Sequence, residues 1–306
     1  MRFYRKKTLI LLSLCWLVLG NLHLRGEDKV SQLDNRLLIQ LTAVRDSLDG
    51  VLGLAVKDLT TGRTFSLNEN EIFPQASSIK IAILLEVLKQ AEENRLRLDE
   101  FVDLKPESKV GGGPILNYLG HPSLKISIQD LCVLMVVLSD NTATNLLIDR
   151  VGMEAVNNRL ASLGLKQTRL RRKMMDLRAA EEGRENISTP GEMMTLLERV
   201  WRGKVLGAEY RQLFFDLLAL PKDSPLQQAV PEGVTVADKP GELEAVRCDS
   251  GVVFLKKRPY IICLMTTFLA PSEDGNAVLR KIGRLVYNHF DRLERSSEYG
   301  RIISER

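Results

Sequence analysis

The chain has 306 residues, 44% of them apolar, which fits one large domain or two domains that share a core. Its formal charge of +4 is a small excess, and no cluster of lysine and arginine lies outside the N-terminus, so we expect no nucleic-acid partner. Histidine is scarce, with only His23, His121 and His289 present. This inventory excludes a histidine-rich zinc site and leaves His121 as the one realistic base for a Ser-His-Asp triad. We therefore expect no metal and no other cofactor.

The N-terminus has the pattern of a signal peptide. A short basic stretch precedes an apolar run over 8–19, which is short for a membrane span. We expect a signal peptide over 1–26; the alternative is an uncleaved anchor, the one case in which the chain would contact a membrane. In both cases we expect export, to the periplasm or the extracellular space. The remaining cysteines, Cys132, Cys248 and Cys263, are odd in number, so at least one thiol is free and no disulfide framework is implied.

The first predicted elements are a helix and a pair of strands. Leucine and valine recur at helical spacing over 30–46. Apolar and β-branched residues over 51–59 and 64–67 flank a turn, which predicts a hairpin. A further helix is predicted from Ser77 to about Glu93.

The middle of the chain is predicted to be helical. The glycines at 111–113 place a loop over 99–113, and apolar runs then indicate helices over 126–138, 142–151 and 154–163. A charged stretch of weak periodicity follows over 167–186. Thr189, Pro190 and Glu192 form a capping box for a helix that runs through Trp201, and 207–218 supplies one more.

After Pro221 the pattern changes to short strands. They are predicted over 234–239, 250–255 and 260–268, and an amphipathic helix over 273–290 follows. Strands at both ends of a helical insert predict an α+β protein whose antiparallel sheet is assembled from both ends of the chain. We expect an α/β subdomain from 27–72 and 226–306, and an all-helical subdomain over 73–225.

Ser77 and Lys80 form a Ser-x-x-Lys motif at the start of a predicted helix. They lie three residues apart on one face, and the helix N-terminus directs free N–H groups toward the serine oxygen. A serine hydroxyl needs a nearby base to act as a nucleophile, and a lysine becomes such a base only where burial or other cations lower its pKa. The alternative is a serine N-cap with Lys80 in solvent, and the motif alone does not decide between them.

Two further motifs follow in order, Ser139-Asp140-Asn141 and Lys239-Pro240-Gly241. Alone, the first also fits a polar turn between helices, and the second a strand that ends in a Pro-Gly turn. As an ordered set with Ser77-x-x-Lys80, the three motifs make the chain resemble the class A serine β-lactamases. The resemblance covers roughly residues 34–290 and includes the stretches Phe73-Pro74, 96–100, 139–147 and Thr168-Arg169-Leu170, and Arg247 with Asp249.

The resemblance implies a fold and a set of roles. The fold is a five-stranded antiparallel sheet flanked by terminal helices, with an all-helical subdomain and the active site between the two parts. Ser77 is the implied nucleophile, Lys80 the first base candidate, and Ser139 the hydroxyl that passes a proton to the leaving amine. The oxyanion hole is implied at the backbone N–H groups of Ser77 and Glu242. The implied substrate-binding residues are Asn141, Lys239, Gly241, Glu242 and Arg247.

Within this set, three residues are expected to do different work. The Asn141 amide is expected to bond both Lys80 and the substrate, and Lys239 to supply positive potential for a substrate carboxylate. Asp140 is expected to brace its loop rather than to take part in the chemistry.

The third motif departs from the family. Pro240 stands where the family has threonine or serine, so the hydroxyl that would bind a substrate carboxylate is missing. Strand alternation would turn the nitrogen of position 240 toward the site, so a proline there need not break a sheet bond. Arg247 matches a family arginine that binds the same carboxylate, which would compensate; the alternative is that Arg247 is a surface charge on a strand.

The second departure concerns deacylation. The resemblance aligns Met174 with the glutamate that activates the deacylating water, and Arg178 with its asparagine partner. A thioether cannot activate water, and Asp176 is the best substitute base nearby in the sequence.

Three hypotheses follow. The first is a class A-type hydrolase that acylates on Ser77 and deacylates slowly or by a substitute base, acting as a monomer on a small β-lactam. The second is a penicillin-binding-protein-like DD-peptidase or esterase that acts on a peptidoglycan-like acyl-peptide. The third is a non-hydrolysing β-lactam sensor that stays acylated.

Overall fold

The computed structural model describes residues 28–120, 123–271 and 273–302. Both the segment 1–26, expected to be a signal peptide, and His121 lie outside these residues. The chain divides into two units, residues 1–36 and 37–306. The described part of the first unit holds only the start of helix α2 (Lys29–Ser47); all the other described helices and strands belong to the second.

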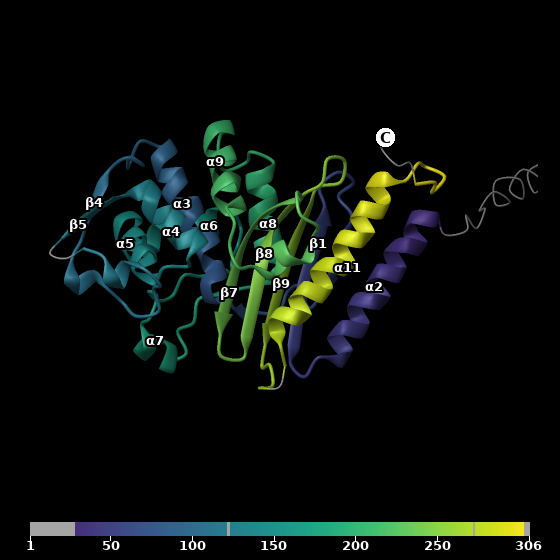
Figure 1. Ribbon diagram of the computed structural model, residues 1–306, viewed down its shortest axis with the longest axis horizontal. Coiled ribbons are helices and arrows are strands. Elements are labelled where there is room, and N and C mark those ends of the chain that lie inside the picture. The colour runs from purple at the N-terminus through teal and green to yellow at the C-terminus, as the bar shows by residue number, and fades with distance from the viewer. Residues whose placement is uncertain (1–27, 121–122, 272, 303–306) are drawn as a thin grey trace, which may run out of the picture. The chain divides into compact units, whose positions relative to one another are not determined.

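A five-stranded antiparallel sheet forms the centre of the second unit (Figure 1). In the order β2-β1-β9-β8-β7, its strands are β2 (Thr64–Leu67), β1 (Val51–Asp58), β9 (Tyr260–Thr267), β8 (Val246–Phe254) and β7 (Thr235–Leu243). The order pairs β1 from the start of the chain with β9 from its end. This arrangement, with helices around it, confirms the predicted α+β fold of the class A β-lactamase type.

Apolar side chains cover one face of the sheet. Helix α11 (Gly275–Arg295) places Leu279, Ile282, Val286 and Phe290 at helical spacing, and these side chains are buried with strand residues such as Leu54 and Leu264. The α2 residues from Leu37 onward join the same cluster through Leu41 and Val44.

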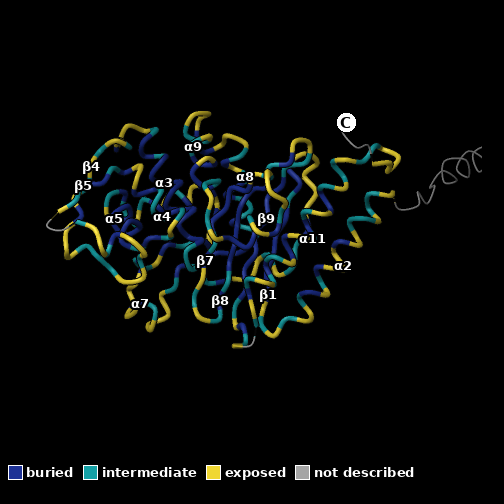
Figure 2. The backbone as a smooth tube through the Cα atoms, viewed as in Figure 1, coloured by how far each residue is buried: buried dark blue, intermediate teal, exposed yellow. Residues whose placement is uncertain are grey.

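The other face of the sheet packs on the helical part of the chain. Helix α8 (Pro190–Trp201) contacts β1 and β9, and α9 (Ala208–Ala219) contacts β7. Helix α3 (Lys80–Glu92) is buried along almost its whole length, as its continuous apolar sequence requires. Figure 2 shows this buried backbone at the centre of the helical part. The remaining helices there are α4 (Ile128–Val137), α5 (Asn141–Val151), α6 (Met153–Ser162) and α7 (Leu177–Glu181), and the short α10 (Pro225–Ala229) precedes β7.

The helical part also contains short strands and turns that the sequence did not predict. Strand β3 (Phe73–Pro74) pairs with β6 (Ile187–Ser188), and β4 (Phe101–Leu104) with β5 (Leu124–Ser127). Three 3₁₀ turns are η1 (Ala76–Ile79), η2 (Pro106–Ser108) and η3 (Leu116–Tyr118). The division into subdomains 27–72 with 226–306 and 73–225 stays a prediction.

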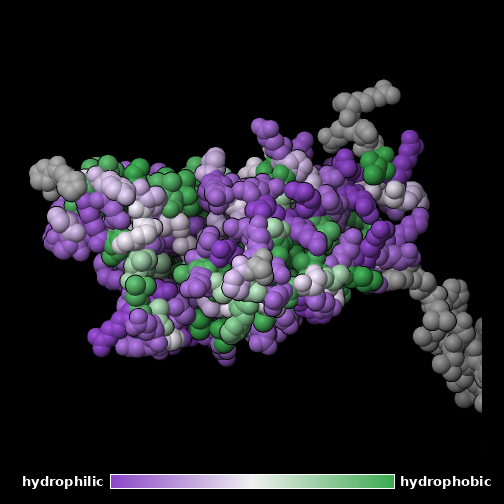
Figure 3. Space-filling model, turned by 60° about the horizontal axis from the view of Figure 1, so that its bottom comes forward, coloured by the Kyte–Doolittle hydropathy of each residue, from purple (hydrophilic) through white to green (hydrophobic). Residues whose placement is uncertain are grey.

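Other surface and core features agree with the sequence. Cys132, Cys248 and Cys263 are free and buried. On the face in Figure 3, hydrophilic surface surrounds several small hydrophobic patches, as on most globular proteins. Within the described ranges, no helix is both long and apolar enough to cross a membrane.

Candidate active site

Ser77 lies in the turn η1, between strand β3 and helix α3. The helix therefore begins as a 3₁₀ turn, and α3 proper starts at Lys80. The Ser78 hydroxyl donates to the backbone oxygen of Lys239 at 2.9 Å, which ties the turn to β7. At Gly241 a Cβ atom would lie 2.9 Å from the Ser77 nitrogen and 2.7 Å from the Gln75 oxygen. Only glycine allows β7 to come this close to the turn, so the backbone of Ser77 lies directly against the strand.

The Lys80 ammonium nitrogen connects the two serines. Its Nζ lies 3.0 Å from Ser77 Oγ and 2.9 Å from Ser139 Oγ, and it also donates to the Ser139 backbone oxygen at 2.7 Å. Asn141 Oδ1 accepts a further bond at 3.2 Å. The residue has no solvent exposure, so these contacts hold Nζ in a fixed position between the two hydroxyl groups.

Ser139 is held in an unusual backbone conformation. Its φ of +53° lies in the left-handed region, which non-glycine residues adopt rarely and at a cost in energy. The next residue, Asp140, is buried and caps α5 by accepting the Ala143 N–H at 2.9 Å, and it also accepts the Leu116 N–H at 3.4 Å. Asp140 therefore braces the loop, in line with the structural role expected for it, and Ser139 projects toward Lys80.

Burial lowers the pKa of both lysines in the site, and the charge of Lys239 lowers the pKa of Lys80 further. The pKa of Lys80 is held well below its ordinary value, first by desolvation and then by the charge of Lys239. The pKa of Lys239 falls to about 8, chiefly because its ammonium is buried. Since Lys239 Nζ also lies 3.2 Å from Ser139 Oγ, one hydroxyl receives contacts from both lysines. Lys80 thus has the environment that a lysine base needs.

The third motif is part of a regular strand and does not end it. Strand β7 continues through Pro240 and Gly241 to Leu243, with Pro240 opposite Asp249 on β8. Because β7 is an edge strand, the missing N–H of Pro240 is tolerated on its unpaired side. The interpretation of Lys239-Pro240-Gly241 as a strand end was therefore wrong, whereas the expected tolerance for proline agrees with the structure.

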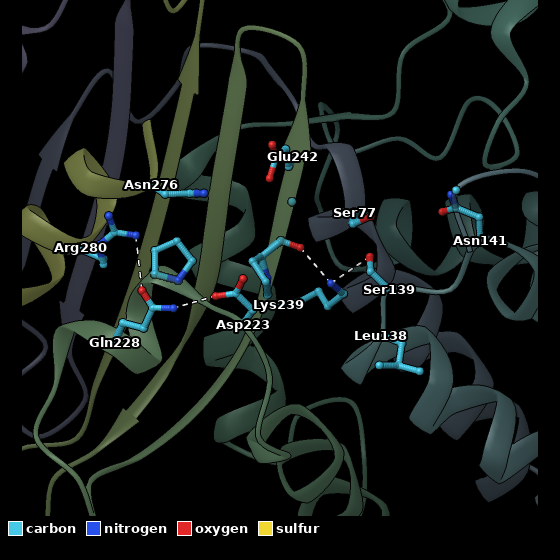
Figure 4. Close-up of a pocket in the computed structure, with 14 residues that line it drawn as sticks. Ser77, Leu138, Ser139, Asn141, Asp223, Gln228, Lys239, Glu242, Asn276 and Arg280 are labelled. Carbon is cyan, nitrogen blue, oxygen red and sulfur yellow. Dashed lines mark hydrogen bonds between the residues drawn. The ribbon is translucent and has the colours of Figure 1, made fainter. Parts of the chain in front are cut away.

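A cavity of about 300 Å³ opens beside these residues (Figure 4). Six of the residues predicted from sequence line it, namely Ser77, Ser139, Asn141, Lys239, Gly241 and Glu242. Pro240 of the third motif also lines it. The other residues in its wall come from four further regions and were not predicted from sequence: Gly112, Leu138, Asp223 with Pro225 and Gln228, and Asn276 with Arg280.

Three predicted residues do not line this cavity. Lys80 is fully buried behind its wall and reaches it only through Ser77 and Ser139. Arg247 is instead paired with Glu242, with Nη2 2.6 Å from Oε1. Asp176 is exposed and caps α7, accepting the Ala179 N–H at 3.0 Å. Asn141 lines the cavity and accepts from Lys80 as expected, while its Nδ2 donates to the Gly111 oxygen at 3.2 Å.

The segment around Met174, which the resemblance aligns with a carboxylate, is apolar. Met174 is 7% exposed and belongs to the hydrophobic core of the helical part. Asn145 holds its backbone from both sides, with Nδ2 donating to the Met174 oxygen at 3.0 Å and Oδ1 accepting its N–H at 2.8 Å. Arg178 points outward, with its side chain 88% exposed and paired with Glu182 at 3.2 Å.

Arg280 and Asn276 are the cavity residues that sequence reasoning had least chance of finding. They lie four residues apart on α11 and so share one face of the helix. That helix carries several other basic residues, such as Arg284 and Arg292, and the sequence offers no sign of which one faces the cavity. The four-residue spacing of Asn276 and Arg280 shows only that the two share a face of the helix.

Comparisons with known proteins agree with this geometry. The model of the β-lactamase enzyme family matches residues 37–290. The β-lactamase L2 of Stenotrophomonas maltophilia is 30% identical over 251 residues, 79% of this chain and 82% of the relative. An imipenem-hydrolysing β-lactamase of Enterobacter cloacae is 29% identical over 245 residues, 78% of this chain and 83% of the relative.

Solved structures lead to the same group. An ancestral class A β-lactamase superposes with a TM-score of 0.76 at 30% identity, covering 83% of this chain and 100% of the other. A leucine-to-glutamate mutant of the protein PBP-A, in an acyl-enzyme complex with penicillin G, has a TM-score of 0.76 at 26% identity and covers 84% of this chain and 97% of the other. With the shared fold, the family match over most of its length and the motif residues gathered at one cavity, the chain belongs to the class A serine β-lactamase family.

Proposed function

We propose that this protein is a serine hydrolase that opens β-lactam rings through an acyl-enzyme on Ser77 and releases the product slowly. The observation that carries the proposal is the position of Lys80 Nζ, 3.0 Å from Ser77 Oγ and 2.9 Å from Ser139 Oγ. Both distances are within hydrogen-bond reach, which proton transfer requires.

Acylation follows from these contacts. Neutral Lys80 takes the proton of Ser77 as Oγ bonds to the lactam carbonyl carbon, and the lowered pKa makes the neutral amine accessible. When the C–N bond breaks, the ring nitrogen takes a proton from Ser139 Oγ. Lys80 then returns its proton to Ser139, so the pair ends the step as it began.

The negative charge that develops on the carbonyl oxygen during acylation needs hydrogen-bond donors close to Ser77. The backbone nitrogen of Ser77 lies against β7 at Gly241, next to Glu242. Donors fixed in the folded state stabilise a developing oxyanion without rearrangement. We assign this role to the N–H groups of Ser77 and Glu242.

Deacylation lacks an obvious base. Met174 offers no proton acceptor of useful strength, and Asp176 caps α7 away from the cavity. Among the described residues that line the cavity, only Asp223 and Glu242 are carboxylates, and Glu242 is paired with Arg247. We therefore propose that the acyl-enzyme accumulates.

A second candidate function is that of a penicillin-binding-protein-like DD-peptidase or esterase. If the acyl-enzyme is not hydrolysed at all, the protein would be a sensor that stays acylated. The apolar Met174 favours these alternatives, and so does the likeness to PBP-A. For that protein, the solved complex is an acyl-enzyme with penicillin G in a mutant that carries an added glutamate. The same Ser77, Lys80 and Ser139 would serve peptide and lactam substrates alike.

The test is intact mass spectrometry of the protein after incubation with penicillin G. We expect a stoichiometric penicilloyl adduct that decays slowly, and no adduct on Ser77→Ala with an unchanged melting temperature. Labelling that persists in Ser77→Ala would overturn the proposal. A chromogenic cephalosporin then separates the functions, because sustained turnover supports a β-lactamase and a single burst supports a sensor. Cleavage of a D-Ala-D-Ala peptide without lactam turnover supports a peptidase.

We also place the protein outside the cytoplasm, as a monomer that acts on a small acyl substrate. The basic and apolar N-terminal pattern of the sequence supports export. Fractionation of cells that express the full chain, with N-terminal sequencing of the product, would test both the compartment and cleavage near residue 26.

A further inference from the structure

The cavity must recognise its substrate with an unusual set of donors. Pro240 has neither a hydroxyl nor an N–H to offer, and Lys239 is only 1% exposed, with its Nζ committed to Ser139 Oγ and the Pro240 oxygen. A substrate anion beyond the reactive serine therefore needs a donor from another element.

Both terminal nitrogens of Arg247 are engaged within the hairpin, and its Nε is buried without a hydrogen-bond partner among the described residues. Nη1 donates to the Leu243 oxygen at 2.7 Å and the Val246 oxygen at 2.8 Å, while Nη2 pairs with Glu242. Its stem is also confined, because a Cβ atom on Gly275 at the start of α11 would lie 2.6 Å from the Arg247 Cγ. Arg247 thus holds the β7–β8 hairpin together and neutralises Glu242, and releasing it would leave that carboxylate unpaired at the edge of the cavity.

Arg280 is differently placed. It lines the cavity from α11, about one turn after Asn276, and its side chain is 33% exposed. Its two neighbours are distant: Nη1 lies 3.4 Å from Gln228 Oε1 and Nη2 lies 3.5 Å from Asp274 Oδ2. Hydrogen bonds of this length are weak, and a guanidinium has five N–H donors. Arg280 is therefore a cation at the cavity with donors to spare.

A short chain of contacts orients this guanidinium (Figure 4). Gln228 Nε2 donates to Asp223 Oδ1 at 2.7 Å, which turns the Gln228 oxygen toward Arg280. Asp223 and Gln228 both line the cavity. The chain thus sets the orientation of Arg280 without occupying its donors at short range.

We propose that Arg280 binds the carboxylate of the substrate, and that α11 has taken over this task from the β7–β8 hairpin. The inference rests on the proposed function, since it names the group that orients the acyl donor for Ser77. An arginine fork matches the planar geometry of a carboxylate, so the interaction selects for anionic substrates. The carboxylate could belong to a bicyclic lactam or to the C-terminus of a peptide.

The experiment compares penicillin G with its methyl ester, which keeps the lactam and removes the charge. The second-order acylation rate constant of each is measured by stopped-flow or by adduct mass. In Arg280→Ala the ratio of acid to ester should fall by about 10- to 100-fold, the range expected for the loss of one charge-assisted hydrogen bond. In Arg280→Lys, which keeps the charge but not the fork, the ratio should fall less.

Arg284→Ala is the matched control, because it removes an exposed arginine one turn further along α11 that does not line the cavity. Its ratio should equal that of the wild type. Equal losses for acid and ester in Arg280→Ala, or an unchanged ratio, would overturn the inference while Ser77 labelling still supports the proposed function. If neither compound acylates the wild type, the proposed function itself fails.

A second pair of substrates identifies the source of the carboxylate. An acyl-depsipeptide with a free C-terminus and its C-terminal amide are compared in the same variants. Loss of discrimination only among the lactams assigns Arg280 to a lactam carboxylate, and loss only among the depsipeptides assigns it to a peptide terminus. Loss in both series shows that one arginine serves both.

Discussion

The segments that hold Ser77 and Met174 differ in what they offer to a bound substrate. Lys80 has four oxygen contacts between 2.7 and 3.2 Å, all aimed at the reactive hydroxyl groups and their neighbours. Met174 has two contacts, both to its backbone, and its side chain is packed into an apolar core. On the proposed mechanism, the groups that acylation needs are gathered around Lys80, whereas Met174 supplies no base for deacylation.

This difference shows that the two half-reactions are built on separate parts of the chain. A polar network can be complete around Lys80 while the segment around Met174 is apolar, because none of the four hydrogen bonds of Lys80 involves Met174. Variants on each side should therefore affect one rate constant and leave the other unchanged.

The largest effect should come from Lys80→Ala, which removes the proton acceptor of the acylation step. We expect the acylation rate constant for penicillin G to fall by about 10²–10⁴. Stopped-flow measurement of adduct formation checks this. Lys89→Ala, on the same helix but paired with Glu92 far along α3, is the control and should acylate at the wild-type rate. Acylation of Lys80→Ala at the wild-type rate would show that another group takes the proton.

Met174→Glu should change the deacylation rate constant. A carboxylate at this position supplies a base for water, and we expect the adduct to decay about 10²-fold faster, near the lower end for general-base catalysis. Met174→Gln is the matched control, since it has the same shape without a base. Because Arg178 is exposed and paired with Glu182, adding Arg178→Asn to Met174→Glu should change the decay rate little.

Fast, adduct-free turnover by the wild type would contradict this account. Asp176 would then be the group to test, although its place at the N-terminus of α7 makes a role in the cavity unexpected. We expect Asp176→Asn to leave the decay of the adduct unchanged.

A smaller effect is expected from pH. The acylation rate constant should change by about tenfold per pH unit on each limb of its pH profile, and each limb should report one of the two lysines. The rate should rise with pH through the lowered pKa of Lys80, since only the neutral amine accepts a proton. It should fall above about pH 8, where Lys239 loses its charge. In Lys239→Arg, which stays charged, the falling limb should move to higher pH. A falling limb at the same pH in this variant would assign it to another group.

Much of the fold was readable from the sequence because local patterns and tertiary structure agree. Strand β2 has the predicted bounds, and Thr189 caps α8 as expected by accepting the Glu192 N–H. The Glu192 carboxylate does not close the predicted capping box, because it accepts the N–H groups of residues 166–168. Strand β7 was predicted to end four residues early because Pro240-Gly241 has the composition of a turn. The strand continues because it lies at the edge of the sheet and because η1 packs against Gly241. Both are contacts between distant parts of the chain, which local sequence does not reveal.

The site was readable to the extent that motifs fix it. The ordered set of motifs indicated Ser77, Lys80 and Ser139, and their side chains do meet at Lys80 Nζ. Arg247 and Arg280 could not be told apart in this way, since each is an arginine on a polar face and only packing decides which one meets the cavity. Asp176 does not line the cavity, because its proximity to Met174 in sequence does not determine which way its side chain points.

The grip of Asn145 on the backbone of Met174 separates the shape of this loop from its chemistry. Both hydrogen bonds are made to main-chain atoms, which every residue except proline can supply in full. The position can therefore exchange one side chain for another without losing the contacts that hold its backbone in place. On the proposed mechanism, a change of side chain at this one position would alter the release of product and leave the shape of the loop as it is.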